Sequence, residues 1–420
     1  MEGWKSTFVG GATIDRASSE RPRCLDIATK IEPHCQSEGI EVNRFGYQRA
    51  VLAMAILFAV LLDGCGKPAP ATALPNDEQL KAMLDDQLNY TYTKRYLNLT
   101  DHAAWQIMHG VLPFGQDFKV YDGDQLVGAL GWVLDGNKMK GWMPQHGDEL
   151  AGRKGLKMLI EAGKSGQGHP DQWLSILGQS GIKSDHKLLF DGHEYQVRDL
   201  MQQALWDIYD GKEASWTLTA ALIYLGPDAK WPASNGKEWT VEDVVKMEAA
   251  QDLGTSACGG THRLAALNRA VRTYRKAHGE PTGAWADAEK KVRDAIETAR
   301  QFQQADGALS CRFFVRPSAS ADNVDMMYST GHTVEFLAMA INDDELDAPW
   351  VKRAVIKLCQ LFQNTRAIDV ECGSLYHAAN GLRKYRERKF GPWTPPAQTA
   401  DPSKRPAATV AAVAGTAPKQ

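Results

Sequence analysis

Two kinds of helical segment alternate along the chain between residues 77 and 393. The first kind is strongly apolar and follows a small or polar residue of the type that caps helix N-termini. Six such segments begin near the landmark residues His102, His169, Trp216, His262, His332 and His377. The landmarks recur at intervals of 45 to 70 residues, which is a loose internal repeat of two helices and a loop.

The second kind of segment is amphipathic and charged, and it separates the apolar segments. In 285–304, Lys, Arg and Glu alternate with Ala, Val and Ile at helical spacing, which predicts a helix with one solvated face. Further charged helices are predicted at 77–97, 148–162, 195–209, 241–253 and 349–364. This alternation predicts an all-α fold, an (α/α)6 toroid with the apolar helices as inner ring and the charged helices as outer ring.

Two stretches interrupt the helical pattern. Residues 118–133 and 188–197 each place an Asp-Gly pair between alternating apolar residues, which is typical of a tight β-hairpin. We therefore expect two small β-hairpin insertions at the rim of the toroid, where a lid could lie. Ordinary loops are the alternative.

An apolar run at 50–62 has a basic flank, Arg44 and Arg49, and is followed by Asp63-Gly64-Cys65. The run is too short to span a membrane comfortably, so it predicts an export signal. It resembles a bacterial lipoprotein signal, which implies acylation of Cys65, a membrane anchor there and an extracytoplasmic, periplasmic location. Asp63 departs from the small or aliphatic residue usual at its position, and an uncleaved anchor is the alternative.

These features divide the chain into five parts. We expect 1–41 to be an over-called, unstructured N-terminus with translation starting near Val42, 42–65 to be the signal, and 66–76 a tether. The toroid follows at 77–393, and the Pro- and Ala-rich tail 394–420 is expected to be disordered. Apolar content of 43% with 48 basic and 51 acidic residues is globular and provides no basic face for nucleic acid.

Four cysteines follow Cys65, at positions 258, 311, 359 and 372. In an oxidising compartment they allow up to two disulfides, such as Cys258–Cys311 or Cys311–Cys372, and buried free thiols are the alternative. Cys258 and His262 are four residues apart, but their irregular spacing from the other Cys and His residues makes a zinc site the weaker interpretation. No metal ligand and no cofactor is assigned.

Residues 303–307, Gln-Gln-Ala-Asp-Gly, resemble the Gln-x-x-Asp-Gly-x-aromatic element of the terpenoid cyclase and protein prenyltransferase superfamily. The resemblance implies an α/α toroid but no particular chemistry. An Asp-x-Asp-Asp acid cluster is missing, since 322–325 reads Asp-Asn-Val-Asp, and Cys258-Gly-Gly-Thr lacks the glutamine of a thioester motif.

Parallel inner helices would bring their N-terminal ends to one mouth, where their dipoles favour an anionic ligand. We therefore predict a central pocket lined by histidines and aromatic residues, although each histidine alone is explained equally by a capping or wall role. The ligand-binding residues expected there are His102, Trp105, His169, Trp216, Arg263 and His377. The catalytic candidates are His262, Tyr328, His332 and Glu335.

The pattern supports two functional hypotheses. The first is a binding or scaffolding module of the cell envelope, favoured because every toroid motif checked is absent. The alternative is an enzyme acting on glycan or isoprenoid, as a lyase, hydrolase or cyclase. A lyase needs a Tyr or His base, and a hydrolase needs two carboxylates, for which Glu335 with Asp325 or Asp252 is the candidate pair. A cluster of perturbed titratable groups around His332 and Glu335 would favour the enzyme.

Overall fold

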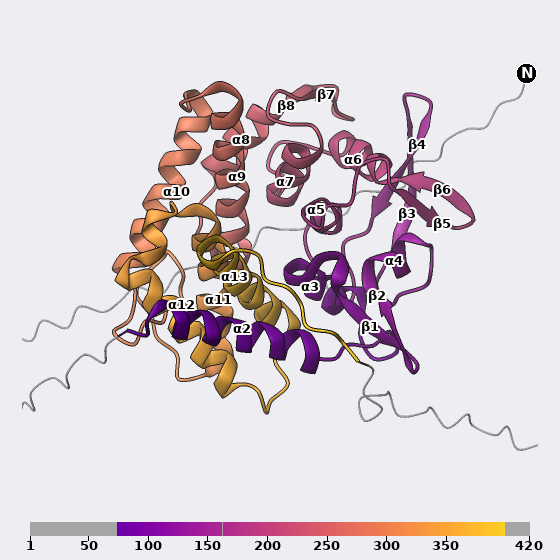
Figure 1. Ribbon diagram of the computed structural model, residues 1–420. Coiled ribbons are helices and arrows are strands. Elements are labelled where there is room, and N and C mark those ends of the chain that lie inside the picture. Colours follow the sequence, from indigo (N-terminus) through magenta and orange to yellow (C-terminus); the bar gives the residue numbers. More distant parts are fainter. Residues whose placement is uncertain (1–73, 162, 400–420) are drawn as a thin grey trace, which may run out of the picture. The chain divides into compact units, whose positions relative to one another are not determined.

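The computed structural model describes residues 74–161 and 163–399 of the chain (Figure 1). In these residues helices predominate, and the strands form two-stranded antiparallel sheets. The mainly helical fold class predicted from the sequence is therefore confirmed. The segments 1–41 and 42–65, with Cys65, lie outside the described residues, as do most of the predicted tether and tail.

Six helices carry the predicted apolar segments, and most of their side chains are buried. They are α3 (Ala104–Phe114), α5 (Gln172–Gln179), α7 (Ser215–Tyr224), α9 (Thr261–His278), α11 (Asn323–Ala340) and α13 (Cys372–Phe390). Each helix in this series contacts the next one, and α13 contacts α3.

A second set of helices packs around the first. They are α2 (Asp77–Lys94), α4 (Ala129–Leu134), α6 (Val197–Trp206), α8 (Val241–Ala250), α10 (Gly283–Gln301) and α12 (Pro349–Asn364). Each contacts at least one helix of the apolar series; α2, for example, lies against α13 and α12 (Figure 1). Short 3-10 turns are η1 (Gly115–Asp117), η2 (Ala257–Gly260) and η3 (Asp344–Asp347).

Both predicted hairpins are present. Strands β1 (Lys119–Asp122) and β2 (Gln125–Gly128) form the first, and β5 (Lys187–Phe190) and β6 (His193–Gln196) form the second. Two hairpins were not predicted, β3 (Pro144–Leu150) with β4 (Arg153–Met158) and β7 (Lys230–Pro232) with β8 (Glu238–Thr240).

The predicted helix at 148–162 is wrong, because this region belongs to the β3–β4 hairpin. Ala151 and Gly152 form its turn with φ angles of 49° and 75°, which a right-handed helix does not allow. The short α4 takes the place of the missing helix in the second set. Its six residues carry no charged side chain, so the pattern used for the other charged helices does not detect it.

Two glycines allow α11 and α13 to approach closely. A Cβ at Gly331 would lie 2.6 Å from the Cβ of Ala378, and a Cβ at Gly381 would lie 2.7 Å from the backbone nitrogen of Glu335. The backbones are therefore near enough for short polar side chains to bridge the two helices.

The element 303–307 links α10 to α11 and to α12. Gln303 donates from Nε2 to the carbonyl oxygens of Gly307 and Trp350, and Asp306 pairs with Lys357 at 2.6 Å. Gly307 has a φ of 94°, and a Cβ there would lie 2.5 Å from the carbonyl oxygen of Arg353. These contacts account for the element by packing alone.

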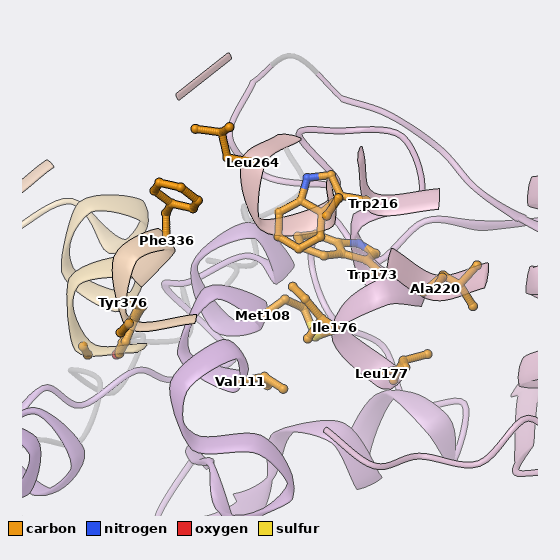
Figure 2. Packing of buried hydrophobic residues seen from close by; sticks show 14 of the residues in the cluster. Met108, Val111, Trp173, Ile176, Leu177, Trp216, Ala220, Leu264, Phe336 and Tyr376 are labelled. Carbon is orange, nitrogen blue, oxygen red and sulfur yellow. The ribbon is translucent and has the colours of Figure 1, made fainter. Parts of the chain in front are cut away.

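The buried core runs between the helices of the apolar series. Met108 from α3, Trp173 and Ile176 from α5, Trp216 from α7 and Phe336 from α11 are among its members (Figure 2). Among the described residues, no helix combines the length and apolar character needed to cross a membrane.

Candidate functional site

Five imidazole rings form a connected cluster where the apolar helices meet. His332 and His377 are stacked with ring centroids 4.2 Å apart, and His262 lies 4.9 Å from His377. His169 is 5.1 Å from His262, and His109 is 5.4 Å from His377. The rings come from α3, α9, α11, α13 and the segment just before α5, so the fold unites segments from distant parts of the sequence.

Four of these rings are oriented by a hydrogen bond at Nδ1. In His169 the partner is Glu213 Oε1 at 2.8 Å, and in His377 it is Glu335 Oε2 at 2.7 Å. In His332 and His109 the partner is a carbonyl oxygen in the preceding helical turn, that of Tyr328 at 2.7 Å and that of Trp105 at 2.5 Å respectively. Because Nδ1 is occupied, Nε2 is the ring nitrogen left for other contacts.

Cys258 lies in η2, directly before α9. Its φ of 50° is followed by 62° at Gly259 and 78° at Gly260, the N-cap of α9, so the chain turns sharply here. The donor atoms of His169, Cys258 and His262 all lie within 4.8 Å of one another. A side chain in this strained conformation is commonly held for a functional reason.

The imidazoles change the ionisation of the sulfur. Burial opposes loss of the proton, but His262, His332 and His169 outweigh it and hold the pKa of Cys258 well below its usual range. Burial lowers the pKa of His169, yet Cys258 and Glu213 raise it overall to about 9. Burial likewise opposes the charge on His332, and Cys258 raises that pKa. The sulfur and the two imidazoles therefore favour each other's charged forms.

The deeper rings stay neutral. Burial, with repulsion from His332 and His262, lowers the pKa of His377 well below its usual range. Burial, together with His377, lowers the pKa of His109 to about 3. The neutral rings offer nitrogen lone pairs and carry no charge.

His262 is the member without partners. Its side chain is 9% exposed, and neither ring nitrogen has a hydrogen-bond partner in the described residues. Trp216 covers the ring with a centroid separation of 4.9 Å. An unsatisfied buried polar group costs about 1–3 kcal/mol, so a nitrogen of this ring is available to a further partner.

Two hollows adjoin the cluster. The outer one, about 140 Å³, is lined mainly by polar residues: Glu213, Ser215, Gln251, Thr255, Ser256, Ala257, His262 and Arg263. The inner one, about 30 Å³, is bounded by Trp216, His262, Glu335 and His377, among others. The predicted central pocket is therefore largely filled by its own histidine and aromatic side chains.

The structure brings together most of the predicted site residues. His169, Trp216, His262, His332 and His377 meet directly. Glu335 binds His377 and Asn380, and the Tyr328 ring lies 4.7 Å from that of His332.

Three predicted residues lie at the edge of the cluster or outside it. His102 accepts at Nδ1 from the backbone nitrogen of Asn98 at 3.1 Å and has no ring contact with the cluster. Arg263 points to Glu248, with Nε 2.9 Å from the carboxylate. Trp105 packs on His109, with the two ring centroids 4.3 Å apart. The Lys164 ammonium lies 5.3 Å from the centroid of the Trp105 ring.

The expectation that all landmarks stand at helix N-termini is wrong for His332 and for His377, which is the sixth residue of α13. The helix α11 begins at Asn323, where Asp322 accepts from the backbone nitrogen of Val324, so His332 lies in mid-helix. Burial of α11 begins at Met326, so the apolar pattern near Gly331 lies well inside the buried part of the helix.

The proposed carboxylate pairs do not form. Asp325 precedes Glu335 by ten residues in α11, which is about 15 Å along the axis, and inverting hydrolases need about 6.5–9.5 Å. Asp252 is exposed and lines a different surface hollow. The proposed disulfides are also absent, since Cys258, Cys311, Cys359 and Cys372 are free in the described part of the chain.

Two members of the site, His109 and Glu213, are not predicted from the sequence. A zinc ligand at Cys258 is there the weaker interpretation, beside a disulfide or a buried free thiol. His109 follows Trp105 by one helical turn, and Glu213 precedes Trp216 by three residues. Both signals exist in the sequence, but neither fits a search confined to helix starts.

Comparisons with protein-family models, with curated proteins and with solved structures find no match for this chain. The function is therefore argued from the site itself.

Proposed function

We propose that the cluster is a zinc-type metal site and that the protein is a metal-dependent enzyme of the cell envelope. One observation carries the proposal: His169, Cys258 and His262 place their donor atoms within 4.8 Å of one another. Thiolate and imidazole are the ligands that zinc prefers among protein side chains.

The surroundings of these ligands support the assignment. A ligating histidine normally donates its second ring nitrogen to a carboxylate or carbonyl, as His169 does to Glu213. His262 lies within 4.8 Å of the sulfur of Cys258, whose pKa it lowers, and no carboxylate or carbonyl oxygen of the described residues occupies its ring nitrogens. Zinc bonds of about 2.0–2.3 Å require donor atoms about 3.5 Å apart, so donor atoms that lie within 4.8 Å of one another need to close by up to about 1.3 Å.

A second trio, His262, His332 and His377, also has its donor atoms within 4.8 Å. All three of its members are buried, and it lacks a thiolate. We assign the ion to the first trio because Cys258 and His169 are partly exposed, and because the outer hollow is lined by its third member, His262, and by Glu213, the partner of His169. Three protein ligands would leave the fourth coordination position of the ion open. Catalytic zinc sites have this arrangement, and there the metal lowers the pKa of a bound water.

The fold and location are part of the same proposal. The closed order of contacts from α3 through α13 and back to α3 supports an (α/α)6 toroid. The signal-like segment before Cys65 supports a lipid-anchored protein on the extracytoplasmic side of the membrane.

The hollows favour one substrate class. The hollow of about 140 Å³ beside His262 is too small to enclose a whole ligand, but its polar lining suits the polar end of a glycan or of another envelope molecule. The inner space of about 30 Å³ is too small for an isoprenoid chain, since ligand pockets are typically about 300–1,000 Å³. A binding module is the second candidate, favoured by the same small volume, and its ligand would lie at the rim.

Metal analysis tests the site. We expect the full-length protein, purified in detergent without a histidine tag, to bind about one zinc or cobalt ion per chain. The cobalt form should show a thiolate charge-transfer band that Cys258→Ser removes, while the exposed His193→Ala keeps it. A wild-type protein that binds neither ion, or a band that survives Cys258→Ser, overturns the proposal.

A turnover screen separates the enzyme from the binding module. Uronate polymers, peptidoglycan fragments and a prenyl diphosphate are offered to the metal-loaded wild type and to His332→Ala. Turnover by the wild type that the variant loses supports the enzyme. Binding without turnover supports the module, and equal behaviour of both proteins removes His332 from the site.

A further inference from the structure

Glu248 is a buried carboxylate outside the cluster. It contacts several of the segments whose residues form or orient the cluster. Glu248, near the end of α8, is 0% exposed. It accepts hydrogen bonds from the backbone nitrogen of Ala214 at 2.9 Å and from Ser215 Oγ at 2.6 Å. The same carboxylate accepts from Arg263 Nε at 2.9 Å.

Each of these donors adjoins a residue of the proposed metal site. Ala214 and Ser215 directly follow Glu213, which orients His169. Arg263 directly follows His262. Glu248 therefore joins the start of α7 to the start of α9, the two places from which Glu213 and His262 reach the site.

Arg263 extends the connection to the cysteine. Its Nη1 donates to Ser256 Oγ, and Ser256 is the N-cap of η2, two residues before Cys258. The pair is enclosed, with Arg263 8% and Glu248 0% exposed, so each charge depends on the other. Shifting either side chain therefore shifts the backbone next to His262 and Cys258.

We propose that Glu248 is a positioning residue for the metal site, acting through Arg263, Ala214 and Ser215. The inference rests on the proposed function, because it assigns a role toward that ion. Outer-shell groups of this kind typically change metal affinity about 10- to 100-fold when they are removed. Glu248 touches no member of the cluster, so its effect has to arrive through the backbone that it holds.

The first test variant is Glu248→Gln in the full-length protein. Glutamine keeps the shape but turns an N–H group toward donors, which leaves Arg263 unpaired. We expect cobalt affinity, measured by competition with a chelator, to fall about 10- to 100-fold, with a shift of the cobalt absorption bands. Glu248→Asp keeps the carboxylate and should recover part of the affinity.

Stability and positioning are separated by two more variants. Glu248→Leu with Arg263→Met replaces the buried pair by apolar side chains of similar size, which often preserves stability. Asp85→Asn is the matched control, since Asp85 pairs with the buried Arg386 at 2.8 Å between α2 and α13, away from the cluster. It should lower the Tm and leave cobalt affinity within about twofold, because distant sites act independently.

The outcomes distinguish the two proposals. Wild type that binds no ion overturns the metal site itself. If the wild type binds cobalt, and Glu248→Gln and the double variant bind it with the same affinity, only the positioning role is overturned. An affinity loss in Asp85→Asn as large as in Glu248→Gln also overturns it, because the effect then follows general stability. Loss in Glu248→Gln, partial recovery in Glu248→Asp and an unchanged Asp85→Asn support it.

Discussion

The Nδ1 atom of His377 lies 2.7 Å from Oε2 of Glu335, and both side chains are buried between α11 and α13. The other carboxyl oxygen accepts from Asn380 Nδ2 at 2.6 Å. Burial raises the pKa of Glu335 and lowers that of His377, so the contact is held by hydrogen bonding more than by opposite full charges.

Removing this carboxyl group should destabilise the protein. Glu335→Ala leaves His377 Nδ1 and Asn380 Nδ2 buried without partners, at about 1–3 kcal/mol each. Chemical denaturation should report a loss of that size in the free energy of unfolding. Glu335→Gln keeps an acceptor and should lose less; equal stability of wild type and Glu335→Ala would contradict the assignment.

The close approach of α11 and α13 makes a second prediction. Gly331→Ala places a Cβ 2.6 Å from that of Ala378, so the helices have to separate, at about 1–3 kcal/mol. His332 should move with its helix, while cobalt affinity should change little, because His332 is not a member of the first trio. Gly131→Ala in α4, where no atom lies within 4 Å, is the control and should stabilise by about 0.5–1 kcal/mol. Thermal unfolding of both variants decides, and a Gly331→Ala protein as stable as wild type contradicts the packing argument.

The helical part of the fold was predictable because burial repeats with the helical period. The charged helix α10 and the apolar helix α9 differ plainly in sequence, and the Asp-Gly turn of β5–β6 is a local signal. The β3–β4 hairpin was missed because its charged residues also fit a helical face, and only the positive φ angles at Ala151 and Gly152 exclude a helix.

The site was predictable only in part, because its members are united by packing between helices. The landmark residues include His169, His262, His332 and His377, because each of them lies in an apolar segment. The spacing of these residues does not reveal a metal site, because Cys258 and His169 are 89 residues apart in the sequence and come together only through the turn at η2. Glu213 and Glu248 act through hydrogen bonds that no spacing rule encodes.

Acid should weaken the cap of α13. Glu371 accepts from the backbone nitrogen of Ser374 at 2.8 Å. Burial raises the pKa of Glu371, but Ser374 and Lys164 outweigh burial and hold the pKa below its ordinary value of 4.5. A lowered pKa in the folded state contributes stability above 4.5 that is lost as the pH falls through the folded value.

Two substitutions test this contribution by chemical denaturation at pH 7 and pH 4. Glu371→Ala should cost about 0.5–2 kcal/mol at neutral pH and show a smaller loss on acidification than wild type. Glu371→Ser keeps a capping oxygen without a titrating group, so it should retain stability while losing the same share of the pH dependence. An acid response identical in all three proteins would show that other carboxylates account for it.

Alkylation should distinguish the cysteines. Burial raises the pKa of Cys359 and of Cys372 to about 12, with nearby acidic groups adding to the effect, so both thiols should resist iodoacetamide at pH 8. Cys258 is partly exposed and should react in protein stripped of metal, and a bound ion should protect it. Peptide mass spectrometry of stripped and zinc-loaded protein measures all three sites. Fast labelling of Cys258 in both forms would show that its sulfur holds no ion, and labelling of Cys359 in the folded protein would contradict its burial in α12.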